Sequence, residues 1–171
     1  NNYHVDVSWA AGTGGANHYH VRSSSDSYAT VKYNGSSTSW TETNLSANTS
    51  YTYRIYAVNA DDAENTSYVT ATDTTPPAAP TGLTHTGHTG GNETSTIVWD
   101  WADVTGATSY KVYAGSHSDS ETTQVTGCVD PTSSTCTATG LSTNTQQTIH
   151  VHAYNTNGKG AGSSNASAYT W

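Results

Sequence analysis

The chain has 171 residues and a formal net charge of −8, with 13 Asp and Glu against five Lys and Arg. The basic residues are few and scattered, which excludes a nucleic-acid-binding surface and a basic patch for anionic lipid. No apolar run is long enough to span a membrane, and no secretory signal pattern opens the sequence, so we expect any signal peptide to have been removed.

Aliphatic residues are scarce. Leu, Ile, Val and Phe number 18 together, whereas Ser and Thr number 54, and there are 12 Tyr and five Trp. So low an aliphatic content occurs in disordered chains, but only 11% of the residues are charged, which argues against disorder. We therefore expect a folded chain with a largely aromatic core, made of Trp9, Tyr19, Trp40, Tyr51, Tyr53, Trp101, Tyr110 and Ile149.

Alternation of apolar and polar residues, which is typical of half-buried β-strands, recurs along the chain. In chain order, the predicted strands cover residues 3–9, 19–21, 51–57, 97–101, 110–112 and 149–153. Clusters of Gly, Asn, Asp and Pro separate them, and helix signals are nearly absent. Short strands with frequent turns predict an all-β sandwich.

A segment with three prolines, residues 74–80, divides the chain into two similar halves. Proline favours a stiff, extended backbone and is excluded from central strands. Motifs before the segment recur after it at offsets of 91 to 96 positions; for example, Leu45-x-x-Asn48-Thr49 matches Leu141-x-x-Asn144-Thr145. The sequence therefore predicts two copies of one module, residues 1–75 and 76–171.

Three motifs of the second copy carry a family resemblance: Pro76-Pro-Ala-Ala-Pro-Thr-Gly-Leu83, Gly106-Ala-x-x-Tyr110-x-Val112-Tyr113 and Ala153-Tyr-Asn155-x-x-Gly158. With them, residues 76–171 resemble a fibronectin type III domain. The first copy resembles the same family, but its first strand is missing. The resemblance implies two tandem immunoglobulin-like β-sandwiches, the first lacking its N-terminal strand, in a secreted or cell-surface repeat protein of bacterial or archaeal type.

The missing strand leaves an unpaired edge on the predicted strand Tyr3–Trp9, and natural proteins normally cover such edges. Two hypotheses account for it. The chain is an excerpt of a longer repeat array, or a neighbouring chain donates the strand and so builds a filament.

The second copy departs from the family at two positions. Gln147 stands at the tyrosine-corner position that Tyr51 fills in the first copy, and Cys136 stands where the first copy has Trp40. We expect a disulfide between Cys128 and Cys136 across a hairpin, with two free buried thiols as the alternative. A zinc site would need four ligands. A disulfide indicates an extracellular or periplasmic setting.

Histidines occur in two alternating pairs, His18 with His20 and His150 with His152. Their apolar neighbours are expected to point inward, so all four histidines are expected to point outward. An outward pair can bind a metal, but no Asp, Glu or Cys completes either set in the sequence. We therefore interpret the four as solvated strand-face residues and expect no metal and no cofactor.

Catalytic motifs are also missing. The sequence has no Gly-x-Ser-x-Gly elbow and no phosphate-binding glycine motif. The acidic stretch Asp61-Asp62-x-Glu64 has too few spaced oxygen ligands for a calcium loop and is expected to be an ordinary turn. We expect no catalytic residues and no enzymatic activity.

Two surface features remain. Aromatic and imidazole side chains on the outward sheet face form a candidate contact surface for sugars or another subunit, although β-propensity alone also explains tyrosine there. This candidate contact face consists of His18, His20, Tyr56, Tyr113, His150, His152 and Tyr154. Six sequons are candidate N-glycosylation sites in a cell that glycosylates asparagine: Asn34, Asn44, Asn48, Asn65, Asn92 and Asn165.

These observations predict a non-catalytic structural or adhesive module of an extracellular or cell-surface protein. Its expected partners are other protein domains, identical subunits or carbohydrate. The alternative is a spacer or carbohydrate-binding accessory module of a secreted polysaccharide-degrading enzyme.

Overall fold

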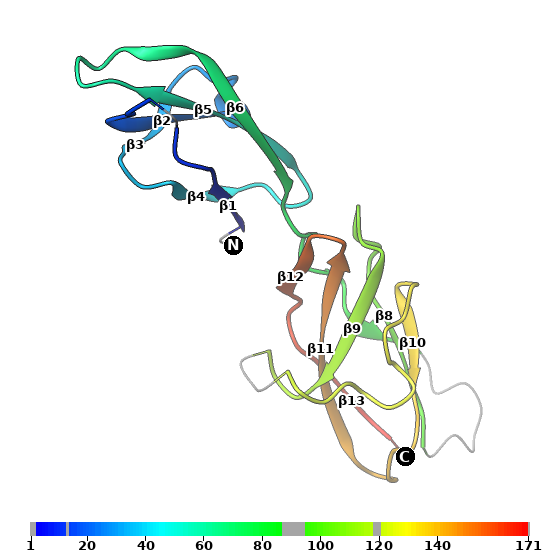
Figure 1. Cartoon of the computed structure of the whole chain (residues 1–171). Coiled ribbons are helices and arrows are strands. Elements are labelled where there is room, and N and C mark those ends of the chain that lie inside the picture. The colour runs from blue at the N-terminus through cyan, green and yellow to red at the C-terminus, as the bar shows by residue number, and fades with distance from the viewer. Residues whose placement is uncertain (1–2, 13, 87–94, 118–120, 171) are drawn as a thin grey trace. The chain divides into compact units, whose positions relative to one another are not determined.

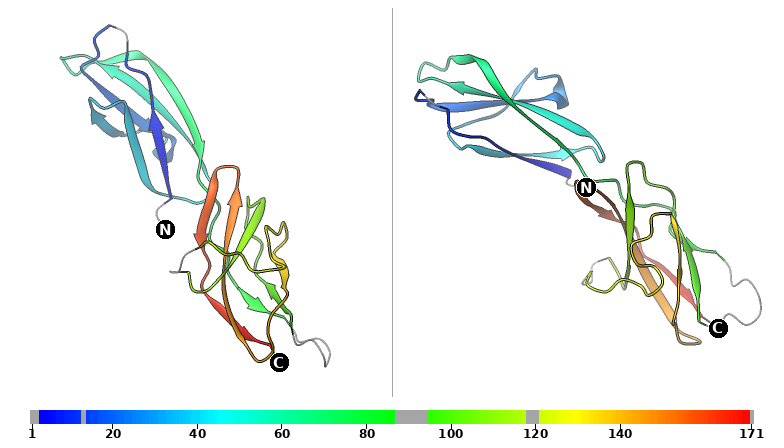
Figure 2. Two further views of the ribbon diagram at one scale, coloured as in Figure 1. Left: turned by 60° about the horizontal axis from the view of Figure 1, so that its bottom comes forward. Right: turned by 45° about the vertical axis from the view of Figure 1, so that its right-hand side comes forward.

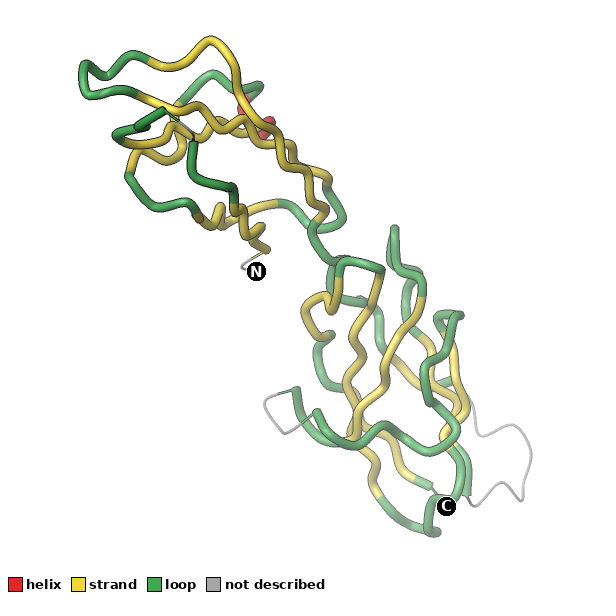
Figure 3. Tube along the Cα trace, viewed as in Figure 1, coloured by secondary structure: helices red, strands yellow, loops and turns green. Residues whose placement is uncertain are grey.

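The computed structural model describes residues 3–12, 14–86, 95–117 and 121–170. The chain forms two compact units, Asn1–Thr75 and Pro76–Trp171 (Figure 1). Within the described ranges the regular structure is β-strand, apart from one 3₁₀ turn, Ser24–Asp26 (Figure 3). None of the described residues lies in a helix long and apolar enough to cross a membrane.

The first unit is a sandwich of two antiparallel sheets (Figure 2). The smaller sheet pairs β1 with β4, and the larger has the order β3-β2-β5-β6. Polar and apolar residues alternate in β1 so that Val5 and Val7 are buried while their neighbours are exposed. The strands are β1 (Tyr3–Ser8), β2 (His18–Ser23), β3 (Val31–Gly35), β4 (Ser39–Leu45), β5 (Ser50–Val58) and β6 (Glu64–Thr74).

The second unit repeats this architecture with one strand more in its smaller sheet. That sheet has the order β10-β8-β7, and in the larger sheet β11 pairs with β9, β12 and β13. In the described part of the first unit, β1 has no partner in the place where β7 pairs with β8. The predicted tandem of β-sandwiches, the first without its N-terminal strand, is confirmed. The strands are β7 (Thr84–His85), β8 (Ile97–Asp100), β9 (Ser109–Ala114), β10 (Thr135–Ala138), β11 (Gln146–Asn155), β12 (Gly158–Gly162) and β13 (Ala166–Tyr169).

Aromatic rings occupy much of both cores, as the composition requires. Tyr53 is fully buried in the first unit and Trp99 in the second. Trp9 and Trp40, in contrast, are only partly buried and pack against the edge of the first core. The expectation of a largely aromatic core therefore holds, with Trp99 as a central ring that the expected set did not contain.

A buried threonine at the end of each unit ties the last strand to a turn. The Thr75 hydroxyl donates to the Ser46 carbonyl at 2.6 Å and accepts from the Thr49 amide at 3.0 Å. Thr170 donates to the Ser142 carbonyl in the same way. The two units thus share interior polar contacts as well as strand order.

The tyrosine-corner position differs between the units. In the first, the Ser46 amide donates to the Tyr51 hydroxyl at 3.0 Å, which fixes the turn before β5. In the second, Gln147 instead accepts from the Trp99 indole N–H at 3.2 Å. The glutamine therefore satisfies the polar atom of a buried ring.

Cys128 and Cys136 form a disulfide, with their Cα atoms 5.3 Å apart. Cys128 is 1% exposed and belongs to the second core. The residue before it, Gly127, has φ +85°, and a Cβ there would lie 2.2 Å from the Thr137 carbonyl oxygen. Glycine is therefore required where the chain approaches β10 closely enough for the disulfide to form.

Replacing Tyr51 with Phe should lower the free energy of unfolding of the first unit by about 1 kcal/mol, because the Ser46 amide loses its acceptor. Urea unfolding of the full chain, resolved into the transitions of its two units, measures this. Tyr68→Phe is the matched control. Tyr68 is 44% exposed, and its hydroxyl makes no hydrogen bond to any described residue. Equal effects of the two variants would contradict the role given to Tyr51.

Reducing the disulfide should destabilise the second unit alone. The bond joins residues eight positions apart, and closing so short a loop stabilises by about 2–3 kcal/mol through the entropy of the unfolded chain. Urea unfolding with and without a thiol reductant tests this, with the cysteine-free first unit as the internal control. A parallel fall in both transitions would contradict it.

Candidate functional site

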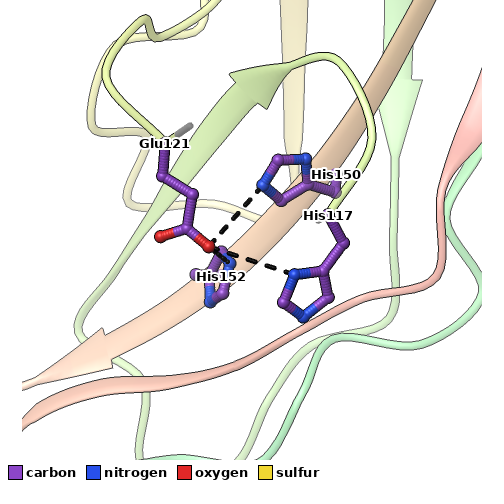
Figure 4. A group of neighbouring side chains, drawn as sticks. All are labelled: His117, Glu121, His150 and His152. Carbon is purple, nitrogen blue, oxygen red and sulfur yellow. Dashed lines mark ion pairs between the residues drawn. The ribbon is translucent and has the colours of Figure 1, made fainter. Parts of the chain in front are cut away.

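Three histidines and one glutamate meet on the larger sheet of the second unit (Figure 4). This cluster, called here the histidine–glutamate cluster, consists of His117, Glu121, His150 and His152. His150 and His152 lie on β11, while Ile149 and Val151 between and beside them belong to the core. His117 and Glu121 come from the segment that follows β9. One strand and one connecting segment therefore build the cluster.

Backbone carbonyls fix the orientation of the two strand histidines. His150 Nδ1 lies 3.0 Å from the Gly115 carbonyl oxygen, and His152 Nδ1 lies 2.8 Å from that of Gly160. A carbonyl oxygen only accepts hydrogen bonds, so each Nδ1 carries the proton and donates. In the neutral rings, each Nε2 is then an unprotonated acceptor. Both rings are almost completely buried, at 0% and 1% exposed.

Glu121 lies at the centre of the cluster. Its Oε1 is 2.8 Å from His152 Nε2, 3.9 Å from His150 Nε2 and 4.0 Å from His117 Nδ1. Its Oε2 accepts from the Lys159 ammonium. Desolvation opposes ionisation, but the Lys159 hydrogen bond and the nearby His152 together hold the pKa of Glu121 below its usual range. Glu121 is therefore an anion at neutral pH.

His117 is positioned by the neighbouring strands. Its backbone N–H donates to the Asn165 side-chain oxygen at 2.8 Å. Its ring lies over Gly162, where an added Cβ would be only 2.5 Å from Nε2. The absence of a side chain at Gly162 lets the ring approach the sheet and directs Nδ1 toward Glu121.

A second group of histidines and acids lies on the larger sheet of the first unit. His18 Nε2 is 3.0 Å from Asp62 Oδ1, and His20 Nδ1 is 2.8 Å from Glu64 Oε1. Arg22 also binds Glu64 Oε1, at 2.8 Å. The strand pairing of β2 with β5, and of β5 with β6, brings this acidic stretch beside the histidines. The stretch predicted to be an ordinary turn thus supplies both carboxylates.

Known proteins share this fold. A family model described as "Fibronectin type III domain" matches residues 1–73. Over these residues the chain is similar to the fibronectin type III family. Among curated proteins, none matches the chain in sequence.

Three solved structures are similar to the chain. A two-domain fibronectin type III segment of chicken tenascin is 16% identical and has a TM-score of 0.51, with 99% of this chain and 93% of that chain covered. A chicken CNTN1 FN1–FN3 segment is 18% identical and has a TM-score of 0.49. The match covers 98% of this chain and 62% of that segment. An Fn3-like protein from Clostridium thermocellum is 28% identical and has a TM-score of 0.45. The match covers 56% of this chain and 95% of that chain. The tenascin likeness shows the fold of both units, which is the predicted tandem of immunoglobulin-like β-sandwiches.

The interpretation of the paired histidines as solvated is wrong for three of the four. His20, His150 and His152 are buried, and only His18 is partly exposed. The expectation that no carboxylate completes either pair is also wrong, since Asp62 and Glu121 do so. Strand phase gives the direction of a side chain correctly but says nothing of the segments that fold over it.

The candidate contact face is also less exposed than expected. Tyr113 is 7% exposed and stacks on His150, with ring centroids 5.6 Å apart. Tyr56 and Tyr154 are partly buried, with Tyr56 against Tyr68 at 5.1 Å. Most of this set therefore packs within the protein, and it does not form an open platform for stacking on sugars.

The sequons lie on the surface of the two units where the structure describes them. Asn48 is partly exposed, and Asn165 also accepts the His117 backbone N–H. Asn92 lies outside the described residues. The exposed sequon asparagines are Asn34, Asn44, Asn65 and Asn165.

The ion pairs of Glu64 should make the stability of the first unit depend on pH in the acid range. Desolvation opposes the shift, but His20 and Arg22 hold the pKa of Glu64 below 4.5, its value in the unfolded chain. A lowered pKa stabilises the fold above the unfolded value, and this stabilisation is lost as pH falls through the folded value. Glu64→Gln should therefore have a shallower loss of stability below pH 4.5.

Urea midpoints of the first domain measured along a pH series test this. Asp61→Asn is the control, since the Asp61 carboxylate forms no ion pair with any described residue. A Glu64→Gln variant as acid-sensitive as the natural chain would contradict the prediction.

Proposed function

We propose that this chain is a non-catalytic structural or adhesive module of an extracellular or cell-surface protein. Fibronectin type III domains are structural or binding modules, the first unit is similar to this family, and a second compact unit follows it. The observation that carries the extracellular part of the proposal is the Cys128–Cys136 disulfide, which takes up both cysteines of the chain. Disulfides persist in oxidising compartments and are rare in the cytosol.

The surface chemistry supports this location. Ser and Thr make up 54 of the 171 residues, and four sequon asparagines are exposed. Such a surface is polar with little charge and offers many hydroxyls for attached sugar. A spacer module of a secreted polysaccharide-degrading enzyme would need the same polar surface and the same extracellular location. The two proposals differ only in whether a catalytic domain lies beside these units in the full protein.

The connection between the units supports a role as a repeat. Thr75 is followed directly by Pro76 and Pro77, whose rings fix φ and remove two backbone donors. Thr75 itself is buried and bonded to the preceding turn, so the first unit is closed up to its last residue. A short junction between closed units is suited to a chain of repeated domains.

The free edge of β1 supports assembly through strand pairing. Among the described residues, β1 pairs with β4 alone. An extended segment added at this edge would complete a three-stranded sheet like that of β10-β8-β7. The segment would come from an adjoining part of a longer chain or from an identical subunit, and the second source would build a filament.

The location is tested in the native host. A tagged chain should be accessible to external protease on intact cells or be recovered in the medium. Both cysteines should resist a maleimide reagent until a reductant is added. Recovery in the cytosol with two reactive thiols would overturn the proposal. Because the first unit has no cysteine, any maleimide labelling reports on Cys128 and Cys136 alone.

A further inference from the structure

The histidine–glutamate cluster has the donor set of a metal site. Its four ligand atoms, three imidazole nitrogens and one carboxylate oxygen, lie within 4.8 Å of one another. They converge from β11 and from the segment after β9 (Figure 4). We propose that His117, Glu121, His150 and His152 bind one Zn²⁺ ion.

Two buried acceptors point into the cluster without a hydrogen-bond donor. With Nδ1 of His150 and His152 donating to backbone carbonyls, each Nε2 presents a lone pair to the cluster. Neither Nε2 has a hydrogen-bond partner among the described residues. Leaving a buried polar atom unsatisfied destabilises the fold, whereas histidines that bind metal have this arrangement, one nitrogen held by a carbonyl and the other free to coordinate.

The contact between His152 and Glu121 requires a cation. His152 Nε2 and Glu121 Oε1 are both acceptors when the ring is neutral, yet they lie 2.8 Å apart. Two lone pairs at that distance repel each other unless a proton or a metal ion lies between them. A bound metal ion removes the conflict.

The size and chemistry of the cluster suit zinc. Ligands about 2.0–2.1 Å from a tetrahedral ion lie about 3.3 Å from one another. Glu121 Oε1 is 2.8, 3.9 and 4.0 Å from the three nitrogens, so shifts of well under 1 Å would bring it to that spacing. Imidazole nitrogen favours zinc over calcium and magnesium, which prefer oxygen.

Four protein ligands make a closed site, the type that stabilises structure. The ion would hold His117 and Glu121 against β11 and so fasten the segment after β9 to the sheet. Lys159 on Oε2 leaves Oε1 free for the metal, and Asn165 and Gly162 keep His117 in place. These residues orient the ligands without binding the ion.

The acidic group of the first unit is the weaker candidate, although it also gathers His18, His20 and Asp62. It supplies three ligands, and the Asp62 side chain is 72% exposed. The Arg22 guanidinium, a permanent cation, already occupies Glu64 beside it. The group in the first unit therefore serves as the control for zinc binding at the histidine–glutamate cluster.

Titration of the metal-free full chain with ZnCl₂ by calorimetry tests the proposal. The natural chain should bind Zn²⁺ at the second unit, and zinc should raise the melting temperature of that unit. His117→Ala and Glu121→Gln should each weaken binding at least about tenfold, the lower end of what the loss of an outer-shell partner alone costs. Both lie on a connecting segment outside the core, so the fold is retained. Co²⁺ in place of zinc should give the intense visible absorption of a tetrahedral site.

Asp62→Asn is the matched control, because it removes the carboxylate of the first unit's group and should leave zinc binding unchanged. His152→Gln should abolish binding, with circular dichroism to confirm folding. A natural chain that binds no zinc would show that a proton alone bridges His152 and Glu121, and would overturn the proposal. Binding that is lost in Asp62→Asn but retained in Glu121→Gln would place the site in the first unit and overturn it equally.

Discussion

Ring packing between the two sheets of each sandwich is the constraint on which this fold depends, since only 18 residues are Leu, Ile, Val or Phe. Trp101 meets Tyr110 edge to face, with ring centroids 5.2 Å apart. Each ring buries more area than an aliphatic side chain, and edge-to-face contacts add to that burial. A few aromatic residues therefore stabilise a core that the aliphatic residues could not fill.

Tyrosine adds a polar atom to this packing. The Tyr19 hydroxyl accepts from the Gly12 amide at 3.0 Å, and the Tyr110 hydroxyl accepts from the Val104 amide at 3.0 Å. These tyrosines occupy matching positions in the two units, so in each unit one side chain both fills the core and ties down the preceding loop. Phenylalanine, which the chain lacks, would do only the first. The aromatic composition is thus linked to the order of the loops.

Most of the architecture could be predicted from the sequence because it rests on local patterns. Alternation located the strands around Val5, Tyr53 and Ile149, and the repeated motifs located the two copies. Seven strands were not among the predicted ranges: β3, β4, β6, β7, β10, β12 and β13. The longest of them, Glu64–Thr74, was missed because most of its side chains are exposed and it carries no apolar alternation. Its place in the sheet follows from pairing with β5, a long-range contact that periodicity does not contain.

The histidine–glutamate cluster could be predicted only in part. Alternation showed that His150 and His152 share one face of a strand. The missing information was that His117 and Glu121, four positions apart in a connecting segment, fold back over that face. No periodicity exists in such a segment. The one available signal was the His-x-x-x-Glu spacing after a predicted strand. This spacing indicates a site only when it is known that the two side chains lie close to β11.

The burial of β11 on both faces explains why the cluster and its covering segment depend on each other. A central strand with Ile149 and Val151 on one side and two histidines on the other can be buried only if the imidazole nitrogens find partners. The Gly115 carbonyl, which holds His150, belongs to the same segment that carries His117 and Glu121. The segment therefore contributes His117 and Glu121 beside both histidines and satisfies Nδ1 of His150, whereas Gly160 of β12 satisfies Nδ1 of His152. Loss of its contacts would expose polar atoms in the middle of the sheet.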